Sequence, residues 1–246
     1  MPGPTVDNAE VLLAAIVVGA TPTEGSAFTI AAGANAILFF VSIIITDPPP
    51  VSVAWKVGET TQEATLVEFV IPGAGADITI SAWRLDNPTI GEGTAVIEVD
   101  ITQAVVLTAV SIAGAGETRA IGTNTSDGLA DGLAVSEDAI ENDLVITGVS
   151  KRNDSELIAS IDADTTLENT STTSMGASGV CQIVGAETAA GDGTITHTAS
   201  FSPDRPGAGV MLVIGPAPEP PEPPEPSPGR GRTRTRNDWT RGHLAT

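Results

Sequence analysis

The sequence predicts an all-β fold: a jelly-roll-like sandwich of two packed sheets, followed by a Pro-rich linker and a basic C-terminal tail. Three observations carry this prediction. Apolar residues recur at the two-residue period of strands, and helical periodicity is nearly absent. Val, Ile and Thr are abundant, and 26 Gly and 18 Pro punctuate the chain between them. The composition then changes abruptly after residue 215. About thirteen short segments qualify as strands, which is enough for two sheets.

Individual segments indicate where the core lies. The stretch "AILFFVSIII" at 36–45 is apolar at almost every position, and a strand tolerates this only when both of its faces are covered. In "DITISAWRL" at 77–85, alternate residues point to opposite faces of a sheet. Trp55 and Trp83 lie in apolar strands and are expected to be buried, because each hides a large area. Cys181, in "GVCQIVG", is expected to be a small buried hydrophobe.

Two segments are predicted to be long excursions from the sandwich. Residues 114–142 are small, acidic and Gly-rich, and residues 136–140 are expected to form one helical turn capped by Ser136. Residues 162–179 have a similar character. Long loops in compact domains are usually functional, so we expect both segments to contact a neighbouring subunit or a receptor.

The chain offers few side chains for catalysis or metal binding. His197, expected to be exposed on a strand, and His243 in the tail are the two histidines, and no nucleophile motif is present. We therefore predict no enzymatic turnover and no cofactor. Acidic turns at 127–131, 162–164 and 192 leave two interpretations open, solvated turns or calcium ligands. None matches the twelve-residue calcium loop, so we predict no metal site.

The charge is divided unevenly along the chain. Residues 1–215 contain 27 of the 31 acidic residues and six of the eleven basic ones. So acidic a body repels nucleic acid and anionic membranes, because binding to either depends on Lys and Arg. The N-terminus lacks a basic residue ahead of its apolar stretch, so no signal peptide is predicted. The longest apolar run is about half of the ~20 residues that a spanning helix needs. We expect synthesis in a cytoplasm, and neither a membrane nor nucleic acid as a partner.

The last residues form a segment of their own. We divide the chain into a β-sandwich domain (1–215), a polyproline linker (216–228) and a basic docking tail (229–246). The linker, "PAPEPPEPPEPSP", is typical of extended polyproline II and reaches on the order of 40 Å. The tail contains five of the nine arginines. The residues that we expect to dock on a partner are Arg230, Arg232, Arg234, Arg236, Trp239, Arg241 and Leu244.

Alternating arginines in an extended tail face one side, where they can meet a row of carboxylates, while Trp239 and Leu244 supply apolar anchors. The hypothesis is that the tail binds an acidic surface of a neighbouring subunit. Two alternatives stay open, a disordered solubilising tail and a nucleic-acid ligand for the arginines.

Several stretches together resemble a known group of proteins. They are "GANAILFFVSIII", "VSVAWKVGE", "ITISAWRLDNPTIGEGTAVIEVDI", "VVLTAVSIAGAG" and "SFSPDRPGAGVMLVIGPA". The resemblance is to a diffuse group of β-sandwich, jelly-roll-like structural domains of bacteriophage virions, of the tail-associated or capsid-surface type. It covers residues 26–216 and is carried most directly by "WRLDNP" at 83–88 and "GTAVIEV" at 93–99.

This resemblance implies a virion structural protein made in the host cytoplasm and present in many copies, as a capsid-decoration, head-fibre or tail-fibre-like subunit. Its partners would be copies of itself and other virion structural proteins, with a host-surface glycan as a further ligand. The alternative, of a different class, is a bacterial surface-filament subunit or an adhesive carbohydrate-binding module.

Overall fold

The computed structural model describes residues 2–44, 51–72, 78–126, 132–153, 158, 160–172, 179–201 and 206–219, and these residues form strands and turns without a helix. The strands are β1 (Thr5–Val17), β2 (Thr23–Ile30), β3 (Ala34–Ile43), β4 (Val51–Val57), β5 (Thr60–Glu63), β6 (Thr65–Val70), β7 (Thr79–Asp86), β8 (Gly91–Val99), β9 (Gln103–Ala113), β10 (Ala115–Ser126), β11 (Gly132–Ala139), β12 (Leu144–Asn153), β13 (Ser160–Ile161), β14 (Thr165–Thr172), β15 (Gly179–Thr188), β16 (Gly193–Ser200) and β17 (Gly207–Pro216).

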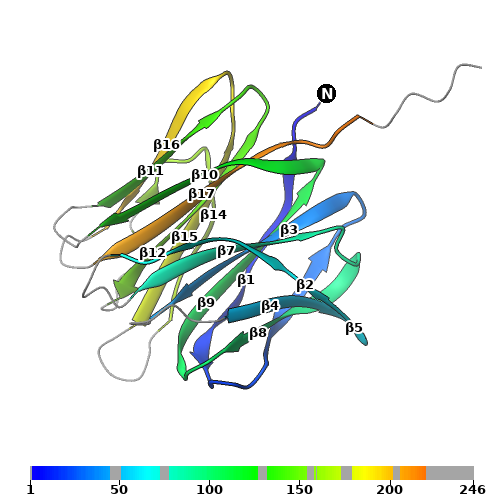
Figure 1. Cartoon of the computed structure of the whole chain (residues 1–246), viewed down its shortest axis with the longest axis vertical. Coiled ribbons are helices and arrows are strands. Elements are labelled where there is room, and N and C mark those ends of the chain that lie inside the picture. The colour runs from blue at the N-terminus through cyan, green and yellow to red at the C-terminus, as the bar shows by residue number, and fades with distance from the viewer. Residues whose placement is uncertain are drawn as a thin grey trace, which may run out of the picture.

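Within the described residues these strands form four antiparallel sheets. Sheet I has the order β2-β8-β4-β5, sheet II β1-β9-β3-β7-β6, sheet III β10-β17-β12-β15-β14 and sheet IV β11-β16-β13. Separate hydrophobic clusters lie between sheets I and II, between II and III, and between III and IV. The sheets are therefore stacked in the order I to IV, from the β4 and β8 side of Figure 1 to the β11 and β16 side.

The strands of each half pair as a long hairpin that has been rolled up. In the first half β1 pairs with β9, β2 with β8 and β3 with β7. In the second half β10 pairs with β17, β11 with β16 and β12 with β15. Such nested pairing is jelly-roll connectivity. The predicted all-β, jelly-roll-like sandwich is confirmed. The chain forms two such sandwiches, one in each half and with the same strand order, where one was expected.

The central strand β3 explains why its sequence is apolar throughout. Phe39 is in the cluster between sheets I and II, whereas Phe40 is in the cluster between sheets II and III. The prediction that both faces of this strand are covered is confirmed. Trp55 and Trp83 are buried as predicted, and their indole Nε1 atoms donate to the Thr89 carbonyl (3.0 Å) and to Ser81 Oγ (2.9 Å).

Sheets II and III stack with an approximate two-fold relation. The equivalent strands contact each other reciprocally: β1 lies on β14 and β6 on β10, and β9 lies on β15 and β7 on β17. This reciprocity is what an isologous dimer interface has, here within one chain. Near the centre, a Cβ atom on Gly148 of β12 would lie 2.5 Å from the Phe40 ring. Glycine is needed at this position because the aromatic ring occupies the space.

Buried polar groups fix how the two halves meet. Gln182 of sheet III is almost completely buried, and its Nε2 donates to Ser42 Oγ (2.7 Å) and to the Phe40 carbonyl (3.2 Å) of sheet II. Its Oε1 accepts from Thr108 Oγ1 at 2.5 Å. Because an unpaired buried amide is costly, this network favours one stacking geometry over others.

The two predicted excursions are wrong. Residues 115–126 and 132–139 are strands β10 and β11, and residues 136–140 do not form a helical turn, because Ser136 pairs with Thr196 of β16. Residues 165–172 form β14, which pairs with β15. The composition misled because β10, β11 and β14 each have a solvent-exposed face that is rich in Thr, Asn, Asp and Glu.

Candidate functional site

All the predicted docking residues lie outside the described part of the chain. They are Arg230, Arg232, Arg234, Arg236, Trp239, Arg241 and Leu244, and the structure describes the chain as far as residue 219. The docking role, and the limits of the linker and the tail, therefore stay predictions.

The body carries a groove at the seam between the two halves. It has a volume of about 410 Å³ and lies between β1, at the edge of sheet II, and the β14–β15 side of sheet III. Its lining residues are Thr5, Val6, Leu144, Asp164, Thr165, Leu167, Ala186, Glu187 and Thr188. Most of the lining side chains are apolar or Thr, and the carboxylate of Glu187 lies on the opposite face of sheet III, beside His197.

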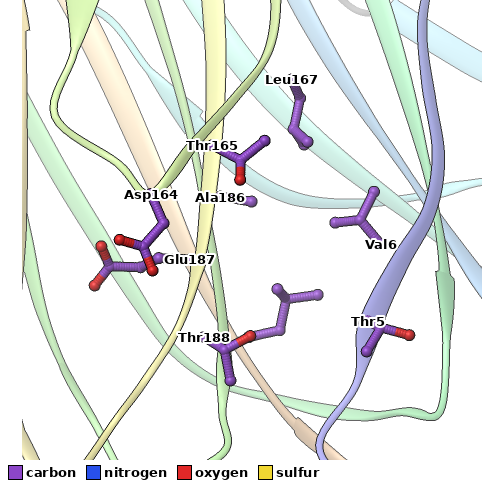
Figure 2. Close-up of a pocket in the computed structure, with 9 residues that line it drawn as sticks. Thr5, Val6, Asp164, Thr165, Leu167, Ala186, Glu187 and Thr188 are labelled. Carbon is purple, nitrogen blue, oxygen red and sulfur yellow. The ribbon is translucent and has the colours of Figure 1, made fainter.

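The apolar lining of the groove belongs to the core between sheets II and III. In Figure 2 the carboxylates of Asp164 and Glu187 are drawn together, away from the β1 residues Thr5 and Val6. Val6 and Leu167 are partly buried against the core between sheets II and III, and Leu144 belongs to that core. Sequence reasoning missed this site because its residues come from four separate segments that only the fold brings together.

The groove lies near the end of the molecule where β17 ends and the linker begins. The Ala217 amide, just after β17, donates to the Gly114 carbonyl at 2.8 Å. Pro4 lies beside Gly114, the residue between the two halves, and Pro4 is next to the groove residue Thr5. The N-terminus, the junction of the halves and the start of the linker therefore gather at one end of the body (Figure 1).

Behind the groove, Glu187 is in contact with a buried histidine. His197 of β16 is fully buried, its Nδ1 is 2.8 Å from Thr147 Oγ1, and its Nε2 is 3.2 Å from Glu187 Oε2. The buried Nε2 atom has no hydrogen-bond partner among the described residues. The prediction that His197 is exposed is wrong. His197 and Ala199 share the inward face of β16. The sequence "TITHTAS" already displays this alternation, because Thr occupies every second position from 194 to 198.

Two carboxylates lie close together where β1 meets β14. Burial of Glu168 on β14, together with the nearby charge of Glu10 on β1, raises the pKa of the Glu168 carboxyl above its ordinary value. Like charges therefore face each other where β1 meets β14.

The acidic turns that the sequence singled out have structural partners. Asp162 accepts a hydrogen bond from the Thr198 amide, and Asp192 Oδ1 accepts from the Glu141 amide at 3.0 Å. Residues 127–131 lie outside the described residues. In the described part of the chain no group of three or more His, Cys, Asp or Glu side chains could hold a metal ion.

Cys181 is buried as predicted, and burial raises the pKa of its thiol, so it packs as a small hydrophobe. Among the residues that the structure describes, there is no helix of the length and hydrophobicity needed to cross a membrane.

Comparisons of the chain with protein-family models, with curated proteins and with solved structures found no match.

Proposed function

We propose that this chain is a structural subunit of a bacteriophage virion, as a capsid-decoration, head-fibre or tail-fibre-like component that assembles through its sandwich faces and its C-terminal tail. In this proposal the chain functions by assembling with other proteins and has no enzymatic turnover. It is made in the host cytoplasm and binds copies of itself and other virion structural proteins. The resemblance of residues 26–216 to virion β-sandwich domains is one support, and the physical properties of the body are the other.

The observation that carries the proposal is the rigid stacking of two jelly-roll-like halves in one chain. The halves share a hydrophobic core, and the hydrogen bonds of Gln182 fix their relative position. A subunit that repeats in an assembly must present its contact surfaces at a constant geometry. Two halves that cannot rotate against each other meet that requirement.

The edges of the sheets suggest how copies would meet. Register shifts interrupt the edge strands β1, β2, β6, β10 and β14. Bulges of this kind twist an edge away and oppose pairing with a strand of another chain. Assembly through sheet extension at these edges is therefore disfavoured, and contacts through faces, ends and the tail are favoured.

Charge layout supports a role for the tail. The body has a large excess of carboxylates, whereas residues 229–246 contain five arginines and one acidic residue. Oppositely charged parts on one chain give each copy both halves of an electrostatic contact, and such contacts increase association rates and fix register.

The experiment is to delete residues 229–246 and to measure incorporation of the chain into particles over a series of salt concentrations. We expect the truncated chain to be incorporated less than the full chain, with the difference shrinking as salt rises. Equal incorporation at every ionic strength would contradict assembly through the tail.

A further inference from the structure

The two sandwiches of the chain can be compared position by position. β6 and β14 each have a register shift just before a glutamate, Glu68 and Glu168. The last residue before that shift pairs with Trp83 of β7 in the first sandwich, formed by sheets I and II. In the second sandwich, formed by sheets III and IV, it pairs with Gly185 of β15. Trp83 and Gly185 therefore occupy equivalent positions, from which neighbouring strands can be matched.

The strands beside β7 and β15 match in the same way. Phe39 of β3 pairs with Trp83, and Thr147 of β12 pairs with Gly185. Phe39 and Thr147 are therefore equivalent, and each points from the inner sheet of its sandwich toward the outer one.

Two further pairs follow along the chain. Leu85 and Glu187 are the last residues but one of β7 and β15. The connections after these strands have the same length, and β8 and β16 both begin with a glycine of positive φ. The fifth residue of β8 is Ala95, and the fifth residue of β16 is His197. Ala95 and His197 are thus equivalent residues of the two outer sheets.

In the first sandwich these positions are apolar. Phe39, Leu85 and Ala95 all belong to the cluster between sheets I and II. That cluster contains four aromatic rings, and rings of this kind hide about 150–250 Å² each. Sheet I is therefore held on sheet II by burial of apolar surface.

In the second sandwich the same positions are polar or ionisable. His197 is fully buried, with Nδ1 2.8 Å from Thr147 Oγ1 and Nε2 3.2 Å from Glu187 Oε2. The buried Nε2 has no hydrogen-bond partner among the described residues. Since the first sandwich fills these positions with Phe39, Leu85 and Ala95, the fold itself does not require a polar cluster here.

A buried lysine extends the contrast. Lys151 lies four residues after Thr147, as Ile43 lies four residues after Phe39. Lys151 is 3% exposed, and its Nζ is 5.9 Å from the centroid of the Phe201 ring. Phe201 is the one aromatic residue among the described members of the cluster between sheets III and IV. The second sandwich thus buries ionisable groups where the first buries apolar ones.

We infer that sheet IV is an opening element, which separates from sheet III while sheets I, II and III stay folded. Opening returns the imidazole of His197 and the ammonium of Lys151 to water, so their hydration offsets part of the cost of exposing apolar surface. The equivalent opening of sheet I would expose Phe39, Leu85 and Ile43 without that compensation.

Sheet III can remain in place without sheet IV. Its other face packs on sheet II through a separate cluster, and Gln182 is hydrogen-bonded across that contact. The open state presents the face of sheet III that carries Val145, Val149 and Met211, which the closed body hides. The element therefore conceals an apolar surface until it opens. This inference does not depend on the proposed virion function.

The test is native-state hydrogen exchange of the full-length chain, followed by mass spectrometry of its peptides in low concentrations of urea. Such exchange separates local opening from global unfolding. In the wild type we expect β11 and β16 to be protected at least about tenfold less than the equivalent strands β2 and β8.

Two conservative variants test each sandwich separately. I97V removes one methylene from the buried face of β8, in the cluster between sheets I and II. It should speed exchange in β8 several-fold and leave β11 and β16 unchanged, because the contact of Ile97 survives when sheet IV opens. T147V keeps the side-chain shape but leaves Nδ1 of His197 without its hydroxyl partner, so exchange in β11 and β16 should be about tenfold faster.

The matched control for T147V is S200A, which changes an exposed residue at the end of β16 and should leave exchange in that strand unchanged. Wild-type β16 as well protected as β8 would overturn the inference. So would an I97V variant that speeds β16 as much as β8, since the body would then open as one unit, or a T147V variant that exchanges like S200A. All of these outcomes are measured on the isolated chain. A chain that opens at sheet IV but is absent from particles would refute the virion role and not the opening.

Discussion

Replacing Arg84 by alanine tests how β7 and β10 are held together where sheets II and III meet. The substitution removes hydrogen bonds to Thr118 Oγ1, to the Gly116 carbonyl and to Asp86. The Asp86 side chain is 60% exposed, so its ion pair contributes at most about 1 kcal/mol. The bonds to Gly116 and Thr118 involve partly buried acceptors and a charged donor, and we expect R84A to lose about 2–4 kcal/mol of unfolding free energy in total.

The assay is equilibrium unfolding in urea, because guanidinium chloride would supply the ion that the seam binds. R84K is the matched control: it keeps the positive charge and the apolar stem but lacks the planar fork of donors, so it should fall between R84A and the wild type. An R84A variant within about 0.5 kcal/mol of the wild type would refute the reasoning that a guanidinium holds β10 against β7.

Three further predictions concern buried and terminal groups. The raised pKa of Glu168 means that its charged form is disfavoured in the folded state, so E168Q should be more stable than wild type at pH 7. This advantage should disappear as the pH falls below the ordinary pKa of Glu. Urea unfolding at each pH measures the difference. Q182A leaves Thr108 and Ser42 without their partner and should cost about 1–3 kcal/mol of unfolding free energy, whereas an unchanged urea midpoint would mean that the amide does not fix the stacking. In a variant that keeps Trp239 as its sole tryptophan, fluorescence of the isolated subunit should be fully accessible to a soluble quencher, and protection of Trp239 in a monomer would contradict an undocked tail.

Much of the first half could be predicted from its sequence because its strands are strongly apolar. The run in β3 indicated a strand covered on both faces, and the alternation in β7 placed Trp83 in the core. β10 and β11 were missed because one face of each is polar and their turns are acidic. In that region a strand resembles a loop in composition, and pairing with β16 and β17 decides the structure.

The groove could not be predicted, for a different reason. It is open beside Ala186, which pairs with Thr165 just as Arg84 pairs with Thr65 in the first half. The sequences of the two halves agree visibly only in short stretches such as those that begin at Thr65 and Thr165. An alanine in a strand carries no signal of a missing arginine. That signal appears only when the strand registers place both residues at equivalent positions.

Quantitative mass spectrometry of isolated particles tests the central claim most directly. The measurement gives the number of copies of this chain relative to a capsid protein of known copy number. A repeated structural subunit predicts many copies in each particle, at a constant ratio between preparations and retained through washing at about 0.15 M salt. A chain that is absent from particles, or present only in trace amounts that vary between preparations, would contradict the account.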